Sequence, residues 1–320
     1  MNAAVVESFG APPRYTQFLE PEAAAGELLV HVKAAGLHHV VRGIAGGRHY
    51  GSTVTPPFVP GIDGAGTLED GRRVYFLAAR SPYGSFAERS LTLPSLCLPL
   101  PDGVDDVTAA GSANAAMSAW VALTARAHFK RGESVLVLGA TGVSGSLAVQ
   151  IAKRLGARRV VAAGRNRGAL DALGELGADA VIALDAQRER IVSLLRREIE
   201  ENGIDVVLDY LWGTPAEIVL ESIEGRGLHR AAPRIRYVEI GAAAGSTITL
   251  PGATLRSSGL EILGSGFGSA SSEQILHAIG HFFTEAAKSQ FNVAIRTAPL
   301  RDVEALWKQS DERARLVFEL

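Results

Sequence analysis

Three glycines, Gly139, Gly142 and Gly145, follow a continuous apolar run near the middle of the 320-residue chain. The apolar run Ser134–Leu138 is typical of a buried strand, and the residues after the third glycine have helical periodicity. A glycine-rich turn in this context is tight, lets a ligand approach the backbone, and leads into a helix N-terminus with unpaired N–H groups. The segment therefore predicts a site for the pyrophosphate of a dinucleotide.

The spacing of these glycines departs by one residue from the dinucleotide-binding fingerprint. An ordinary strand-to-helix turn, with small residues that serve packing alone, is the alternative. A phosphate loop of the nucleoside-triphosphatase kind is excluded because no Lys-Ser or Lys-Thr pair follows the last glycine. The turn residues predicted to contact the ligand are Gly139, Ala140, Thr141, Gly142, Val143, Ser144 and Gly145.

The residues after the second predicted strand, Val160–Ala163, indicate which dinucleotide is bound. Proteins that bind NAD place Asp or Glu about 20 residues after the glycines to hold the ribose 2′-hydroxyl. Here that position carries no carboxylate and two guanidinium groups, which suit a 2′-phosphate. The predicted contacts are Gly164, Arg165, Asn166 and Arg167. A solvated basic turn is the alternative, and the position at the end of this strand favours NADP(H) over NAD(H).

Histidines form two candidate metal sites. The first is a group in the first hundred residues that could converge in the fold: His38, His39, His49, Asp63 and Cys97. The second is His277 with His281, at the i,i+4 spacing of a helical zinc pair. Ala278 stands where a metalloprotease helix carries its general-base Glu, and no third ligand is evident. We therefore predict no metal, and His277 and His281 then form one polar edge of an amphipathic helix.

The composition excludes several classes of protein. The chain is 47% hydrophobic and 21% charged, with a formal net charge of −2, so it can bury a large core without a charge excess for nucleic acid. A single cysteine, Cys97, excludes an internal disulfide framework. The first ten residues lack a basic start and an apolar run, and no stretch has the length of a membrane span. We expect a cytoplasmic globular protein that binds neither nucleic acid nor membrane.

The order of elements predicts an α/β protein with two parts. Before residue 104 the chain reads as short strands separated by Pro and Gly turns, which predicts a compact β-rich domain. Apolar strands then alternate with helical segments, the pattern of parallel βαβ units in a doubly wound sheet. After the glycine-rich patch Gly264–Gly268, a helix near Ser272–Ala287 and a last strand Arg315–Phe318 suggest that the chain returns to the first domain.

Several segments, in this order and spacing, give the chain a resemblance to a known family along essentially its full length. They are Val32–Leu37, Pro60–Gly66, Tyr83–Glu88, Gly132–Val137 and Gly177–Asp179. The chain resembles the medium-chain dehydrogenase/reductase superfamily, in its zinc-independent quinone oxidoreductase-like branch. The resemblance implies a GroES-like β-rich catalytic domain of residues 1–117 and 268–320, a Rossmann NADP-binding domain of residues 118–267, and a homodimer.

Positions that hold zinc in zinc-dependent relatives differ in this chain. His38 stands where those relatives have Cys, and Gly61-Ile62-Asp63 stands where they have Gly-His-Glu. Their four-cysteine structural lobe is missing from the sequence. The resemblance therefore implies a metal-free active site between the two domains. His38 also replaces the Asn common in the zinc-independent branch, which leaves the chemistry of the substrate pocket open.

A metal-free site suits hydride transfer that needs no Lewis acid, such as reduction of a quinone or an α,β-unsaturated carbonyl by NADPH. Tyr50 or His38 is the candidate donor to the developing oxyanion, and protonation by solvent is the alternative. By resemblance, five residues lie along the nicotinamide half of the coenzyme: Tyr210, Gly241, Ser265, Gly266 and Phe267. The alternative functions are a non-catalytic NADPH-binding redox sensor or structural protein, and a zinc alcohol dehydrogenase.

Overall fold

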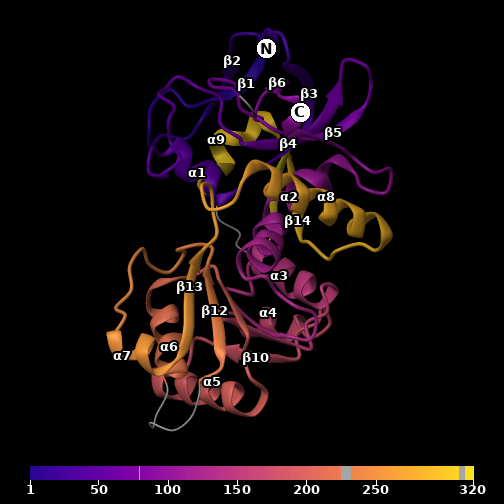
Figure 1. The fold of residues 1–320 in the computed structure, drawn as a ribbon. Helices are drawn as coiled ribbons and strands as arrows, with labels where there is room; N and C mark the ends of the chain where they lie inside the picture. Colours follow the sequence, from indigo (N-terminus) through magenta and orange to yellow (C-terminus); the bar gives the residue numbers. More distant parts are fainter. Residues whose placement is uncertain (79, 225–231, 310–313) are drawn as a thin grey trace. The chain divides into compact units, whose positions relative to one another are not determined.

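The structure is a computed structural model, and it describes residues 1–78, 80–224, 232–309 and 314–320. The chain divides into two compact units, which can be followed by colour in Figure 1. Unit 1 comprises Met1–Ala115 and Leu276–Leu320, and unit 2 comprises Ala116–Ile275. The boundaries expected from the sequence, after residues 117 and 267, differ from these by two and eight residues.

Unit 2 contains a doubly wound sheet, as the alternation of strands and helices predicts. In the described residues this sheet has six strands in the order β10-β9-β8-β11-β12-β13, and each pair of neighbours is parallel. The predicted fold class is therefore confirmed. The strands are β8 (Ser134–Leu138), β9 (Arg159–Gly164), β10 (Ala180–Ala183), β11 (Val206–Asp209), β12 (Arg234–Glu239) and β13 (Gly259–Gly264).

Helices cover both faces of this sheet, which is why its central strands are apolar throughout. Leu136, Val207 and Tyr237 belong to one core cluster together with residues of α5 and α6. Val135 and Val206 point to the opposite face, because side chains alternate along a strand, and they are also fully buried. The helices of unit 2 are α3 (Val143–Arg154), α4 (Arg167–Ala172), α5 (Arg188–Asn202), α6 (Gly213–Ile223) and α7 (Gly252–Ser257).

Unit 1 is built mainly from strands. In the described part of the chain it has a seven-stranded sheet, with the path β14-β15-β3-β4-β5-β7 and β6 paired to β3, and a separate pair β1-β2. Phe318 of β15 pairs antiparallel with Ala35 of β3, so the C-terminal segment adds its strands to the sheet of this unit. The strands are β1 (Asn2–Val5), β2 (Arg14–Gln17), β3 (Leu28–Gly36), β4 (Asp63–Leu68), β5 (Arg73–Leu77), β6 (Arg89–Thr92), β7 (Cys97–Pro99), β14 (Ile295–Pro299) and β15 (Arg315–Glu319).

The remaining helices flank these sheets or link the two units along the chain. They are α1 (His39–Ala45), η1 (Pro94–Leu96), α2 (Asp106–Val121) with the π-helical turn η2 (Ala122–Arg126), α8 (Ser272–Lys288), η3 (Leu300–Asp302) and α9 (Val303–Leu306). Over the described ranges, the helices are all too short or too polar to cross a membrane.

Candidate coenzyme site

The carboxyl ends of the parallel strands in unit 2 meet in one row. Leu138, the last residue of β8, pairs with Ala163 of β9 on one side and with Asp209 of β11 on the other. Farther along the row Asp209 pairs with Glu239, and Glu239 pairs with Gly264. The loops that follow these strands therefore leave the sheet at a common edge, where open α/β sheets bind their ligands.

The order of the strands reverses beside β8. The chain runs outward through β9 and β10 on one side, and then through β11, β12 and β13 on the other. Such a switch point opens a crevice between the loops of the two adjacent strands, and dinucleotides bind there. The predicted glycine turn follows β8 and so lies at this point of the sheet.

The glycine turn is held by the end of the neighbouring strand. Gly139 has a φ of +80°, and its N–H and that of Ala140 both donate to the Ala163 carbonyl, at 2.9 and 3.0 Å. Gly142 is extended and precedes α3, whose first hydrogen bond runs from the Ser146 N–H to the Gly142 carbonyl at 2.8 Å. The amides of the first turn of α3 thus have no partner within the helix and can donate to an anion.

The third glycine lets α3 approach this turn closely. A Cβ atom on Gly145 would lie 2.2 Å from the Gly139 carbonyl oxygen and 2.6 Å from the Ala140 Cα. No side chain fits there without moving the backbone. The turn therefore has the close packing of helix on strand that places phosphate groups against a helix N-terminus.

Thr141 connects the glycine turn to the predicted ribose-phosphate segment. Its side chain lies over Gly164, where a Cβ atom would be 2.7 Å from the Thr141 Cγ2. The structure therefore brings the residues predicted to bind pyrophosphate beside those predicted to bind the 2′-phosphate.

The two arginines of that segment differ in their surroundings. Arg167 is paired with Asp185, with Nε 3.0 Å from Oδ2 and Nη2 3.1 Å from Oδ1. Arg165 is exposed and has no ion-pair partner among the residues that the structure describes. Asn166 caps α4, because its Oδ1 accepts the Ala169 N–H at 3.0 Å. Of the predicted pair of guanidinium groups, Arg165 is therefore the one whose charge is left for a ligand.

Tyr210 and Gly241 lie at the other side of the switch point. A Cβ atom on Gly139 would be 3.4 Å from the Tyr210 Cβ, and one on Gly241 would be 3.4 Å from the Tyr210 carbonyl oxygen. The Tyr210 hydroxyl lies 3.2 Å from the Ser118 Oγ of α2, and burial raises the Tyr210 pKa above its ordinary value. Ser118 carries no signal of this role in the sequence, because the contact joins residues that are far apart in the chain.

The last predicted segment, Ser265–Phe267, continues the row beyond β13. The Ser265 N–H donates to the Glu239 carbonyl at 2.8 Å, and the Gly266 N–H donates to the Ser269 Oγ at 2.7 Å. Ser265 is buried, while Phe267 is 42% exposed. All three residues are thus at the carboxyl edge of the sheet.

Asp209 is a residue of this edge that the sequence analysis missed. Its Oδ1 accepts the N–H groups of Leu211 and Trp212 at 2.7 and 3.0 Å, and its Oδ2 accepts the Tyr237 hydroxyl at 2.7 Å. Burial raises the pKa of Asp209, which is fully buried. Burial and the nearby Asp209 also raise the pKa of Glu239. The hydrogen bonds of Asp209 therefore fix the start of the loop after β11.

The two candidate catalytic residues lie in unit 1 in very different surroundings. His38 is 1% exposed, and its Nε2 lies 3.0 Å from Oδ1 of the fully buried Asp63. The hydroxyl of Tyr75 donates to the other oxygen of Asp63. Tyr50 is 73% exposed, and its ring stacks on His49 with centroids 4.3 Å apart. An exposed phenol can meet a substrate directly, whereas the buried imidazole is engaged with a carboxylate.

The structure brings together two pairs of the candidate metal-binding residues. Of the group in the first hundred residues, the structure brings His38 and Asp63 together. His277 and His281 are exposed on α8, with their Nε2 atoms 3.2 Å apart. Within the described ranges, no three or more His, Cys, Asp or Glu residues are grouped so as to hold a metal ion.

Several known proteins resemble this chain, two of them over essentially its whole length. A family model described as zinc-binding dehydrogenase matches residues 144–282. A probable NADPH-dependent quinone reductase, tdiC, of Emericella nidulans is 28% identical over 99% of both chains. An NADPH-dependent alkenal/one oxidoreductase of Arabidopsis thaliana is 32% identical over 59% of this chain and 51% of its own length. The quinone oxidoreductase of Thermus thermophilus, whose structures include a complex with NADPH, aligns over 100% of both chains with a TM-score of 0.81 and 28% identity.

The chain belongs to the medium-chain dehydrogenase/reductase superfamily, in its quinone oxidoreductase-like branch. The predicted membership of the quinone oxidoreductase-like branch is thereby confirmed. The zinc in the description of the family model carries no information on the candidate zinc positions, because the matched residues 144–282 begin after both His38 and Asp63.

Proposed function

We propose that this protein is an NADPH-dependent oxidoreductase that transfers hydride to a quinone or to an α,β-unsaturated carbonyl compound. The placement of Arg165 carries the proposal: an exposed guanidinium, without an ion-pair partner in the described residues, follows the strand beside the glycine turn. The names of the full-length quinone reductase relative and of the alkenal/one reductase support the substrate class.

The residues of unit 2 fit this coenzyme. The amides at the start of α3 and the close approach of Gly145 to Gly139 suit a pyrophosphate, and Arg165 suits a 2′-phosphate. We propose that Tyr210, Gly241 and the segment Ser265–Phe267 lie along the nicotinamide half. The coenzyme supplies the hydride when it is bound. The contribution of the chain is to hold it in one orientation and to keep water from the reacting carbon.

On an enone, hydride adds to the electrophilic carbon, the carbon–carbon π bond breaks, and negative charge moves to the carbonyl oxygen. On a quinone, the electron pair of the hydride breaks a carbonyl π bond and leaves a hydroquinone anion, whose negative charge also lies on oxygen. A hydrogen-bond donor at that oxygen lowers the barrier, and a proton from solvent completes the reduction. We propose that the Tyr50 hydroxyl is this donor, since it is exposed, and that His38 acts through Asp63 as a positioning residue.

The test is oxidation of NADPH by the purified protein with 9,10-phenanthrenequinone or a simple enone, followed by absorbance. We expect turnover with at least one acceptor and a preference for NADPH over NADH. Binding of NADPH without oxidation across a panel of acceptors would instead favour a non-catalytic redox sensor. Absence of any coenzyme binding would contradict the proposal.

The donor is tested with Tyr50→Phe and His38→Asn, with Tyr15→Phe as a control at another exposed tyrosine of unit 1. Removing one oxyanion donor typically lowers turnover by about 10²–10³-fold. We expect a loss of turnover for Tyr50→Phe and none for Tyr15→Phe. Unchanged turnover in both Tyr50→Phe and His38→Asn would mean that solvent alone protonates the product.

We also propose that the protein acts as a cytoplasmic homodimer without a bound metal. This rests on its resemblance to the zinc-independent branch and on His38 and Ile62, which stand at positions where zinc-dependent relatives have ligands. Light scattering on the native protein and elemental analysis test the two molecular statements. A monomer, or zinc in stoichiometric amount, would contradict them.

A further inference from the structure

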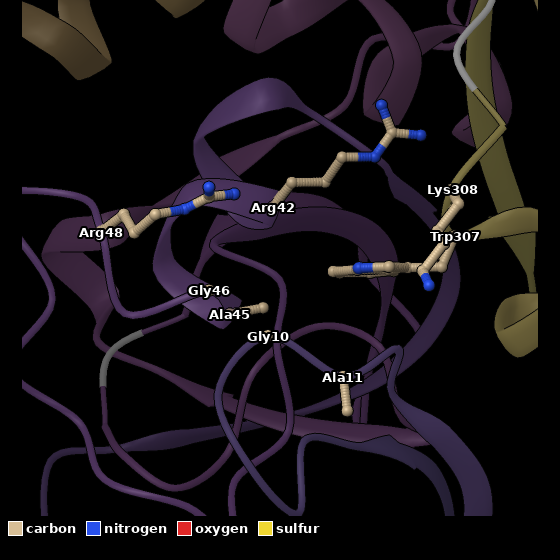
Figure 2. Close-up of a pocket in the computed structure, with 8 residues that line it drawn as sticks. All are labelled: Gly10, Ala11, Arg42, Ala45, Gly46, Arg48, Trp307 and Lys308. Carbon is tan, nitrogen blue, oxygen red and sulfur yellow. The ribbon is translucent and has the colours of Figure 1, made fainter.

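A small cavity of about 270 Å³ lies wholly within unit 1 and is shown in Figure 2. It is formed by the loop between β1 and β2, the end of α1 with the turn after it, and the end of α9. The lining residues are Gly10, Ala11, Arg42, Ala45, Gly46, Arg48, Trp307 and Lys308. The glycine-rich turn of the coenzyme site belongs to unit 2 and contributes nothing to it.

The lining carries positive charge from three side chains and no carboxylate among the described residues. Arg42, Arg48 and Lys308 come from three points around the cavity, and Figure 2 shows Arg48 on the opposite side from Trp307 and Lys308. Arg48 and Lys308 are exposed, so their charges are available to a solute. Three cations around one small volume attract an anion with more than one negative charge.

Arg42 supplies a donor that the protein does not satisfy. Its Nη2 donates to the Gln309 carbonyl at 2.8 Å, whereas its Nε is buried and has no hydrogen-bond partner among the described residues. Burial also lowers the pKa of Arg42, since the charged form loses hydration. An unpaired buried donor is unfavourable. In the described part of the chain, the Arg42 guanidinium is therefore held by one hydrogen bond, to the Gln309 carbonyl, while the side chain lines the cavity.

Trp307 gives the cavity one fixed wall. Its side chain is 7% exposed, and its ring packs edge-to-face against Phe86 with centroids 6.4 Å apart. Gly10, Ala11, Ala45 and Gly46 add no long side chains to the lining, so the space between the cations stays open. The result is a cationic recess with a rigid aromatic edge.

We propose that this recess binds the phosphoryl group of a small phosphorylated molecule. The planar guanidinium groups of Arg42 and Arg48 match phosphate oxygens, and the Lys308 ammonium adds a third charge. The cavity is smaller than the roughly 300–1,000 Å³ of pockets for drug-sized ligands. This volume suits inorganic phosphate or a small phosphorylated molecule such as a sugar phosphate.

The experiment is calorimetric titration of the full chain with inorganic phosphate, with glucose 6-phosphate and with glucose. It is done in an Arg165→Gln background, which removes the proposed coenzyme phosphate contact. We expect binding of one or both phosphates and none of glucose. Tighter binding of glucose 6-phosphate than of phosphate identifies a sugar phosphate as the ligand, and equal binding identifies the free anion. No binding of either phosphate overturns the proposal.

Three variants assign any binding to this recess. Arg48→Gln and Lys308→Gln alter exposed side chains and so preserve the fold, and each should weaken phosphate binding by about tenfold or more. Arg301→Gln, at an exposed arginine outside the lining, is the matched control and should bind as the parent does. Equal binding in all three variants places the anion elsewhere and overturns the proposal.

One further variant excludes occupation by the chain itself. Asp311 and Glu312 follow Lys308 closely in the sequence and lie outside the described residues. If the double variant Asp311→Asn, Glu312→Gln binds phosphate and the parent does not, the recess binds a carboxylate of the chain itself and the proposal is wrong. If the parent and this variant bind phosphate equally, the recess is open to the external anion.

Discussion

Arg167 and Asp185 form an ion pair with two contacts, of 3.0 and 3.1 Å, beside the end of β9. The pair raises the pKa of Arg167 and lowers that of Asp185, chiefly through the hydrogen bonds between their side chains. The charge of Arg167 is thus compensated within the protein, while Arg165, two residues earlier, has no such partner in the described residues. The two arginines of this turn consequently differ in what they can offer a ligand.

Replacing Arg165 by Gln should remove most of the preference for the phosphorylated coenzyme. A lost hydrogen bond between charged groups weakens binding of NADPH by about tenfold to a hundredfold, and NADH should bind as before. Calorimetric titration with each coenzyme measures this. Arg167→Gln is the control, with a change of less than about fivefold because a solvent-exposed ion pair contributes little. The reverse order of the two effects would assign the 2′-phosphate to Arg167.

Replacing Gly145 by Ala should destabilise the glycine turn. The added Cβ atom would lie 2.2 Å from the Gly139 carbonyl oxygen, so α3 must shift. We expect unfolding to become easier by about 1–3 kcal/mol, as is typical of overpacking, together with weaker NADPH binding.

Gly168→Ala is the matched control for this substitution. Gly168 lies in α4, and its added Cβ atom would meet nothing closer than the Asn166 Oδ1 at 3.8 Å. This variant should be more stable than wild type by about 0.5–1 kcal/mol, because glycine is a poor helix former. Chemical denaturation measures the free energy of unfolding of Gly145→Ala and of Gly168→Ala. Equal values would show that α3 shifts without a cost in stability.

Tyr75→Phe should leave Asp63 without its hydrogen-bond donor. Both side chains are fully buried, so one carboxylate oxygen loses a partner that water does not replace. The free energy of unfolding should fall by about 1–3 kcal/mol. Tyr15→Phe, on an exposed strand, should stay within about 0.5 kcal/mol of wild type. Thermal and chemical denaturation provide the comparison, and a Tyr75→Phe variant as stable as Tyr15→Phe would contradict the assigned hydrogen bond.

Asp209→Asn should change how stability depends on pH. Burial raises the pKa of Asp209 in the folded protein, so the folded state holds this proton more tightly than the unfolded state does. The stability from this group is fully present below the carboxyl pKa of the unfolded chain and is lost as pH rises through the raised value. Asp179 and Asp185 have lowered pKa values and act in the opposite direction, so wild type alone does not show the effect.

The informative quantity is the difference in unfolding free energy between Asp209→Asn and wild type. The variant should become more stable relative to wild type as pH rises above about 4, the ordinary pKa of Asp. The difference should stop changing once the pH exceeds the pKa of Asp209 in the folded protein. Denaturation at a series of pH values measures it. A difference that does not change with pH would mean that Asp209 keeps an ordinary affinity for its proton in the folded state.

Local patterns in the sequence predicted much of the fold of unit 2, and long-range pairing explains one strand of unit 1 that they missed. The strand at Ser134–Leu138 was predicted with its observed bounds, because a short apolar run before a glycine has few other interpretations. The strand β4 was missed, since Asp63–Leu68 is rich in small residues and has no apolar alternation. Pairing with β3 on one side and β5 on the other makes it a strand. The helix α6 was missed although Gly213-Thr214-Pro215 at its start is a signal for a helix N-terminus.

Part of the candidate site could also be predicted, because it is formed by local segments of the sequence. Residues 139–145 and 164–167 are contiguous and follow strands, so their chemistry could be inferred without knowing what packs beside them. The partners that distinguish them come from distant segments: Asp185 for Arg167 and Ser118 for Tyr210. Asp209 gave no signal either, because its role depends on burial and on the Tyr237 hydroxyl.

The common edge formed by the strand ends in unit 2 affects how such a protein can diversify. Beyond the residues that bond back to the sheet or pack against it, such as Gly139 and Gly145, the connections at this edge are exposed, and changes there leave the ladder and the interior intact. A lineage that carries this framework can try new ligands by mutating surface connections one at a time, and selection on folding would rarely oppose it.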